Sequence, residues 1–283
     1  MMPVVFGLAV SGKLFYPVYH EQGAAMTDQH AVPAVATAQI AGSRDYQEDS
    51  VAVHALASAA AKRAGELLLV LADGMGGHVG GNIASRLVVE QFCQDYINSQ
   101  ANVVVALRSS LNSANEQLAE AMVETPGLKG MGTTLVGCVI QGNDLYWISI
   151  GDSPLWLFRD GSLQRLNADH SMLPLLDEMV RNGELSSAAA KKDMRRHMLR
   201  SAVAGKVLEL VDLSNEALRL QAEDIVILAS DGVETLAEDE LLAVLEKRHE
   251  QTPQQLADNI MARIEAAGNS TQDNASIILY LCE

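Results

Sequence analysis

The sequence predicts an α+β fold in which stacked, mainly antiparallel sheets are flanked by helices. Short apolar runs rich in Val and Ile, typical of buried strands, alternate with longer amphipathic stretches typical of helices. Two helical stretches follow one another with no strand between them, which breaks the alternation of a parallel doubly wound sheet. Two apolar runs flank the turn sequence Gln-Gly-Asn-Asp at 141–144, as in an antiparallel hairpin.

The elements follow in chain order. Strands are expected at 67–72, 135–140, 145–150, 225–229 and 277–281. Helices are expected over 83–96 and 103–122, where apolar residues recur at helical spacing. A third helix begins at Thr252-Pro253, with Thr252 as N-cap and Gln255 completing a capping box. The polar segment 169–205, rich in Ala, Lys and Arg as at 188–196, is interpreted as a helical flap over the sheets or as an ordinary surface helix pair.

The first part of the chain differs from the rest. Residues 1–33 lack both helical and alternating patterns, so we expect an N-terminal extension that is disordered or strand-forming, or a true start at Met26. Residues 34–283 are expected to form one domain that includes the segment 169–205.

Composition excludes several classes of function. The chain has 36 acidic and 20 basic side chains, a formal charge of −16, which disfavours nucleic acid and anionic membranes as partners. No apolar run approaches the roughly 20 residues of a membrane span. Three separated cysteines, Cys93, Cys138 and Cys282, form no CxxC pair, which indicates a reducing compartment. We therefore expect a cytoplasmic protein that does not cross a membrane.

Aspartates recur at the ends of the expected strands. They are Asp73, followed by Gly74, then Asp152, Asp231 and Asp273. A single Asp-Gly pair is most simply a turn. A carboxylate at the end of a buried strand is costly unless something compensates its charge, however, and here the pattern occurs four times. The repetition favours a shared cation site.

Oxygen ligands from several strands suit Mg²⁺ or Mn²⁺, and the scarcity of neighbouring Cys and His disfavours zinc. Five glycines within 74–81 would let the backbone approach a ligand, and this stretch lacks the GxxxxGK[ST] pattern of a phosphate-binding loop. Two metals would offset the repulsion and generate a hydroxide nucleophile. Arg44, four and five residues before Glu48 and Asp49, could hold a phosphate, although alone this segment would be an ordinary charged loop.

Six motifs along the chain carry a family resemblance. They are Arg44 with Glu48-Asp49, Asp73-Gly74-Met75-Gly76-Gly77, Gly130-Met131-Gly132-Thr133-Thr134, Gly151-Asp152-Ser153, Ser230-Asp231-Gly232 and Asp273-Asn274. Each is weak alone, but all six in this order resemble the PP2C (PPM) family of metal-dependent protein serine/threonine phosphatases of bacterial type. The resemblance implies a four-layer α-β-β-α sandwich, with the segment 169–205 where bacterial members have their flap.

The resemblance also implies roles for individual residues. By family analogy, Asp73 bridges two Mn²⁺ or Mg²⁺ ions, and the Gly74 carbonyl binds one of them. Asp231 and Asp273 complete the shell of the other ion, while Glu48 and Asp49 act directly or through metal-bound waters. Asp152 with Asp231 matches a third-metal position, and Arg44 matches the phosphate-binding arginine. Thr133 and Thr134 are expected to support the site by packing and hydrogen bonds.

The implied reaction is attack of a metal-bridged hydroxide on phosphoserine or phosphothreonine, with two or three ions as cofactors. Its implied partners are phosphorylated proteins that are substrates of a partner kinase, and we expect a monomer. The alternatives are a two-metal hydrolase of small phosphate esters and a catalytically silent metal-binding scaffold. Many eukaryotic members have a proton-donating His where this chain has Met75, so His78 or, as we favour, a metal-bound water would protonate the leaving group.

Overall fold

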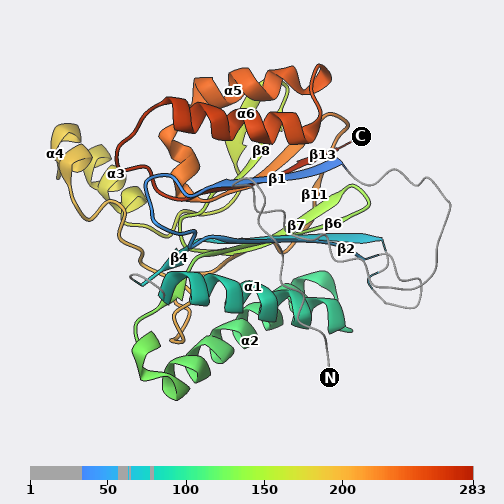
Figure 1. Ribbon diagram of the computed structural model, residues 1–283, viewed down its shortest axis with the longest axis vertical. Helices are drawn as coiled ribbons and strands as arrows, with labels where there is room; N and C mark the ends of the chain where they lie inside the picture. The colour runs from blue at the N-terminus through green and yellow to red at the C-terminus, as the bar shows by residue number, and fades with distance from the viewer. Residues whose placement is uncertain (1–33, 57–62, 64, 77–79, 283) are drawn as a thin grey trace.

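Two antiparallel sheets stack face to face, and helices cover the outer face of each sheet (Figure 1). The structure, a computed structural model, describes residues 34–56, 63, 65–76 and 80–282. One sheet has the strand order β1-β13-β12-β8-β9, and the other has β10-β7-β6-β3-β2 with β11 also beside β7. The predicted four-layer sandwich is therefore confirmed, whereas the expectations for residues 1–33 lie outside the described residues.

The strands are short and mostly buried. The first sheet contains β1 (Ala34–Ile40), β8 (Leu155–Arg159), β9 (Ser162–Arg165), β12 (Ile225–Ala229) and β13 (Ala275–Leu281). The second contains β2 (Ser50–Leu56), β3 (Glu66–Ala72), β6 (Leu135–Gln141), β7 (Asp144–Ile150), β10 (Asp212–Leu213) and β11 (Leu218–Arg219). A separate small pair joins β4 (Gly74–Met75) to β5 (Gly132–Thr133). All five predicted strands are present, and β6 and β7 form the predicted hairpin.

The helices cover the two outer faces. The predicted consecutive pair is α1 (Gly80–Asn98) and α2 (Val103–Glu124) on one face, and α5 (Glu238–Leu245) and α6 (Pro253–Ala266) lie on the other. Short 3₁₀ turns are η1 (Pro126–Leu128), η2 (Asp231–Thr235) and η3 (Glu246–His249). The capping box predicted at Thr252 and Gln255 opens α6. Within the described ranges, no helix combines the length and apolar character that a membrane span requires.

The space between the sheets is a continuous apolar layer. Leu69 and Leu71 of β3 pack in one cluster with Val226 and Leu228 of β12. These two strands are covered on both faces, so every residue in them is buried, and all are apolar except Glu66 at the start of β3. This packing fixes the ends of β3 and β12 relative to each other, and with them the positions of Asp73 and Asp231.

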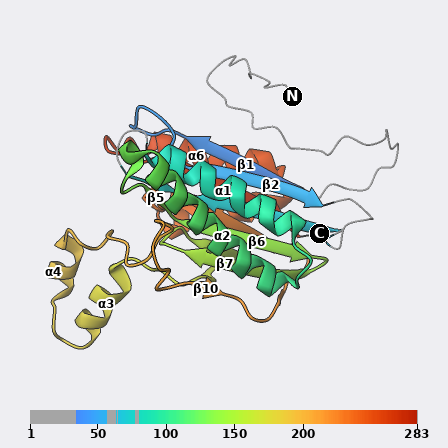
Figure 2. The same ribbon diagram turned by 90° about the horizontal axis from the view of Figure 1, so that it is seen from below.

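A helical lobe projects from the sandwich beyond β9. It contains α3 (Leu173–Arg181) and α4 (Ser187–Lys192), which stand apart from the sheets (Figure 2). Isolated bridges from Ser171 to Leu199 and from Thr133 to Val203 anchor its two ends. Residues 188–196 were expected to be helical, but only 188–192 belong to α4. The helix ends at Lys192 because Asp193 turns the chain, accepting a hydrogen bond from the Arg195 backbone N–H at 2.9 Å.

Candidate metal centre at one end of the sandwich

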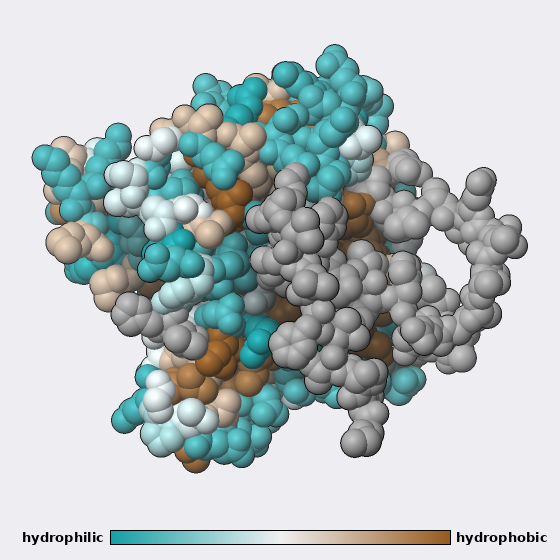
Figure 3. Space-filling model, viewed as in Figure 1, coloured by the Kyte–Doolittle hydropathy of each residue, from teal (hydrophilic) through white to brown (hydrophobic). Residues whose placement is uncertain are grey.

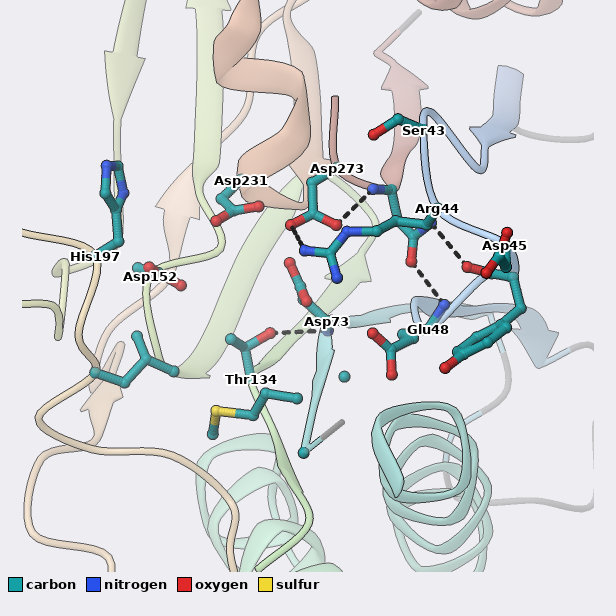
Figure 4. Close-up of a pocket in the computed structure, with 16 residues that line it drawn as sticks. Ser43, Arg44, Asp45, Glu48, Asp73, Thr134, Asp152, His197, Asp231 and Asp273 are labelled. Atoms are coloured by element: carbon teal, nitrogen blue, oxygen red, sulfur yellow. Dashed lines mark hydrogen bonds and ion pairs between the residues drawn. The ribbon is translucent and has the colours of Figure 1, made fainter. Parts of the chain in front are cut away.

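Acidic side chains from five separate segments line one pocket of about 570 Å³. Asp73 follows β3, Asp152 follows β7, Asp231 opens η2, Asp273 precedes β13 and Glu48 precedes β2. Figure 4 shows these carboxylates around a common space. The antiparallel topology brings the relevant ends of distant strands to the same edge of the sandwich.

Hydrogen bonds from two threonines fix the chain at Asp73. The Asp73 backbone N–H donates to Oγ1 of Thr134 at 2.9 Å, and Oγ1 of Thr133 donates to the Asp73 carbonyl at 2.7 Å. The Thr134 hydroxyl also pairs with the Ser153 hydroxyl at 2.7 Å, which ties Asp73 to the loop that carries Asp152. The supporting role predicted for Thr133 and Thr134 is confirmed.

Glycines after two of the aspartates allow neighbouring loops to touch. A Cβ on Gly74 would overlap the carbonyl oxygens of Gly81 and Glu48. A Cβ on Gly232 would overlap the carbonyl oxygen of Asn274. Gly74 and Gly232 are therefore needed because neighbouring backbone segments approach them too closely for a side chain, whatever the role of the aspartates before them.

Asp49, next to the pocket-lining Glu48 in the chain, is only 2% exposed. Its Oδ2 accepts hydrogen bonds from the hydroxyls of Ser230 at 2.8 Å and Ser276 at 2.6 Å. Its Oδ1 is buried and has no hydrogen-bond partner among the described residues. A buried carboxylate oxygen of this kind is costly unless a cation or a water binds it.

The clustered carboxylates perturb one another. Burial, with the charges of neighbouring aspartates, raises the pKa of Asp49 and of Asp152 to about 7. Burial and the charges of Asp49 and Asp231 raise the pKa of Asp73 well above its ordinary value. Burial and Asp273 likewise raise the pKa of Asp231. The polypeptide supplies too little positive charge here to compensate the carboxylates.

The donor set fits a hard divalent cation. It consists of carboxylates and backbone carbonyls, the ligands that Mg²⁺ and Mn²⁺ prefer. Across the described ranges, no three His, Cys, Asp or Glu side chains are already drawn together as a metal shell. Repulsion between the carboxylates keeps them from gathering around one point. Asp273 instead pairs with Arg44, and the distance from Arg44 Nη2 to Asp273 Oδ2 is 2.6 Å. The carboxylates that line the pocket are therefore chemically suited to bind these ions, but they are spread around its wall.

The structure brings the sequence-predicted residues together. Seven of them line the pocket: Arg44, Glu48, Asp73, Gly74, Asp152, Asp231 and Asp273. Asp49 is buried and does not line it, but it is close enough for its charge to raise the pKa of Asp73. His78, considered as a proton donor, lies outside the described residues.

Sequence reasoning missed His197, which lines the pocket together with Leu199. Figure 4 shows its imidazole on the same side of the pocket as Asp152. No motif marks it, and its position in the basic segment 169–205 is the only available signal. Asn274 was noted only as part of a motif, yet its Oδ1 accepts from the Glu48 backbone N–H at 2.8 Å.

Comparison with known proteins agrees with this arrangement. The sequence profile described as protein phosphatase 2C matches residues 41–271, most of the chain. The chain belongs to this family. It is 33% identical over 180 residues to the serine/threonine protein phosphatase PstP of Mycobacterium tuberculosis, an alignment that covers 63% of this chain and 34% of PstP. The chain thus spans about a third of the length of that relative.

One further relative and one solved catalytic domain are matched over most of their own length. The serine/threonine phosphatase stp of Listeria welshimeri is 28% identical over 75% of this chain and 83% of its own. A crystal structure of the PstP catalytic domain in complex with two manganese ions has a TM-score of 0.66 and 26% identity, over 88% of this chain and 98% of that chain.

The raised carboxyl pKa values predict how stability depends on pH when metals are removed. Asp49 and Asp152 bind protons more tightly in the folded protein than in the unfolded chain, where the ordinary value is 3.8. Their contribution to stability is present below about pH 4 and is lost as the pH rises to about 7. We expect the melting temperature of chelator-treated protein to fall over that range, and added Mn²⁺ to raise it most near pH 8.

Asp152→Asn supplies the control for this titration. The variant removes one of the shifted groups, so its melting temperature without metal should depend less on pH between 4 and 7 than that of the unmodified protein. Identical pH profiles for the two proteins would contradict the assignment of a raised pKa to Asp152.

Proposed function

We propose that the protein is a metal-dependent phosphatase that hydrolyses phosphoserine and phosphothreonine in proteins, and that residues 34–283 form its phosphatase domain, with 169–205 as the flap. The observation that carries the proposal is the convergence of Arg44 and the carboxylates on one pocket, in a member of the protein phosphatase 2C family. The names of the relatives, serine/threonine phosphatases, and the manganese-bound PstP structure support the same reaction.

Two or three Mn²⁺ or Mg²⁺ ions would be held at the pocket floor. Asp73, the Gly74 carbonyl, Asp231 and Asp273 would bind the ions directly, and Glu48 and Asp49 would bind them directly or through water. Asp152 with Asp231 would hold a third ion. When bound, these ions supply Lewis-acid charge for the phosphoryl oxygens and a nucleophile from water at neutral pH.

Arg44 would bind the phosphate of the substrate. Its guanidinium is half exposed, lines the pocket and pairs with Asp273. If Asp273 binds a cation, its charge is neutralised, and the Arg44 guanidinium can turn to the phosphoryl oxygens, to which it can donate two parallel hydrogen bonds. Arg44 therefore orients the phosphate and offsets charge that develops as the ester bond breaks.

His197, in place of the metal-bound water favoured from the sequence, would donate a proton to the departing serine or threonine oxygen. The Met75 thioether in the same pocket cannot donate one, and His197 is the imidazole among the described residues that line this pocket. It reaches the pocket from the flap, on the far side of Asp231 from Arg44 (Figure 4). An alkoxide is a poor leaving group, so protonating its oxygen lowers the barrier.

Metal removal and substitution of one assigned ligand test the reaction. We expect the protein to hydrolyse a phosphothreonine peptide with Mn²⁺, to lose activity with EDTA, and to regain it when Mn²⁺ is restored. Asp231→Asn should lower kcat by roughly 100-fold or more, because a neutral amide binds the cation weakly. Peptide turnover unaffected by EDTA, or an Asp231→Asn variant as active as the unmodified protein, would overturn the mechanism.

Arg44→Ala gives a contrast in the same assay. It should mainly raise KM, since Arg44 contacts the bound phosphate and no cation. The assay also separates the alternatives. Hydrolysis of small phosphate esters without phosphopeptides would indicate a small-molecule hydrolase, and Mn²⁺ binding without turnover of either would indicate a scaffold.

The leaving group tests His197. His197→Gln should lower kcat for a phosphothreonine peptide by roughly 100-fold but affect p-nitrophenyl phosphate far less, because p-nitrophenolate leaves without a proton. His249→Gln, an exposed imidazole on η3, serves as the matched control. Equal losses on both substrates would remove His197 from proton donation.

We further propose that the substrates are proteins phosphorylated by a partner serine/threonine kinase, and that the protein acts in the cytoplasm as a monomer. Cys93, Cys138 and Cys282 are buried free thiols, which supports a reducing compartment. Cells lacking the gene should show raised phosphoserine and phosphothreonine occupancy on a defined set of proteins. Unchanged occupancy after removal of both the gene and any paralogous phosphatase would argue against this role.

A further inference from the structure

Positive charge is concentrated in one short part of this acidic chain. Residues 191–200 contain five of the 20 Lys and Arg residues and a single acid, Asp193. The remaining 273 residues carry 15 basic and 35 acidic side chains. The segment closes the flap, running from the end of α4 back towards the sandwich.

Most of these cations are available to a partner. We call Lys191, Lys192, Arg195, Arg196 and Arg200 the flap cationic surface. Lys191, Lys192 and Arg200 are exposed and form no ion pair with any residue that the structure describes. Arg195 is exposed as well, but it pairs with Asp193 at 2.7 Å. Three guanidinium or ammonium groups are therefore free to bind anionic groups of another molecule.

Apolar side chains lie among these charges. Met194 is 94% exposed and Met198 is 58% exposed, although large apolar side chains are usually buried. In the space-filling view the lobe formed by α3 and α4 is mainly hydrophilic, with weakly hydrophobic residues scattered among the polar ones (Figure 3). Methionine is flexible and polarizable, so it suits contact with peptides of varied sequence.

The flap cationic surface leads directly into the catalytic pocket. His197 and Leu199, which lie between Met194 and Arg200 in the chain, line that pocket. Val203 then pairs with Thr133, whose hydroxyl holds the carbonyl of Asp73. A peptide whose phosphorylated residue enters the pocket would therefore place neighbouring residues against this surface.

We propose that the flap cationic surface binds acidic residues that flank the phosphorylated serine or threonine of a protein substrate. The inference rests on the proposed function and adds to it a substrate class, phosphosites in acidic sequence surroundings. Asp, Glu or a second phosphate would pair with Lys191, Lys192 and Arg200, while Met194 and Met198 contact apolar parts of the same peptide. Elsewhere the acidic surface repels the same peptide, which restricts its binding to the flap.

Paired peptides test the selectivity. One phosphothreonine peptide carries Asp and Glu on both sides of the phosphosite, and the other carries Gln and Ala at the same positions. We expect kcat/KM to be roughly tenfold higher for the acidic peptide at low salt. The ratio should approach one at about 0.5 M NaCl, because exposed charges are screened beyond about 10 Å already at 0.1 M.

Charge reversal locates the surface. Lys191→Glu, Lys192→Glu and Arg200→Glu should each lower the acidic-to-neutral ratio of kcat/KM by roughly two- to fivefold, and the triple variant should abolish or invert it. Lys247→Glu makes the same change in net charge at an exposed lysine of η3 and should leave the ratio unchanged.

The outcomes separate this inference from the proposed function. Equal turnover of the two peptides, or an equal effect of Lys247→Glu, would overturn the inference and leave phosphatase activity established. Failure to hydrolyse either peptide with Mn²⁺ present would overturn the proposed function itself. Equal turnover combined with binding to phosphatidylserine vesicles that the triple variant abolishes would assign the surface to a membrane instead.

Discussion

Repulsion between buried carboxylates at one end of the sandwich dominates the electrostatics of this protein. Asp49, Asp73, Asp152 and Asp231 are brought close enough that burial and mutual charge raise the pKa of each. The folded chain alone does not compensate this charge, and a divalent cation with oxygen ligands would. The same feature that makes the metal-free protein sensitive to pH therefore makes the pocket suited to metal-dependent phosphoryl chemistry.

The sandwich opposes that repulsion with packing and hydrogen bonds. The apolar strands β3 and β12 meet in the central layer, and they end one residue before Asp73 and two residues before Asp231. Hydroxyl groups complete the support, since Thr133 and Thr134 hold the backbone of Asp73 while Ser230 and Ser276 hold Asp49. The charged aspartates are thus held in place by neutral hydroxyl groups, which add no further charge to the site.

Opposite requirements meet at the mouth of the pocket. The pocket is lined by carboxylates, as cation binding requires, whereas residues 191–200, two of which line the same pocket, carry the largest local excess of positive charge in the chain. A phosphorylated substrate is anionic and would be repelled by most of this protein's surface. Under the proposed function, Arg44 and the basic residues of 191–200 would offer the positive charge that attracts such a substrate to the pocket.

Features that depend on a local pattern of residues could be predicted from the sequence. Strands covered on both faces, such as β3 and β12, are recognised as apolar runs. The capping box of α6 lies within four consecutive residues. The ordered Asp and Gly motifs indicated the family and the carboxylates that line the pocket. Strand β2 did not stand out, because its residues are mostly only partly buried. Tertiary structure alone decided the pairing of Arg44 with Asp273, 229 positions apart, the serine contacts of Asp49 and the entry of His197 into the pocket. Such contacts join segments that only the stacking of the two sheets brings together, and no local spacing encodes them.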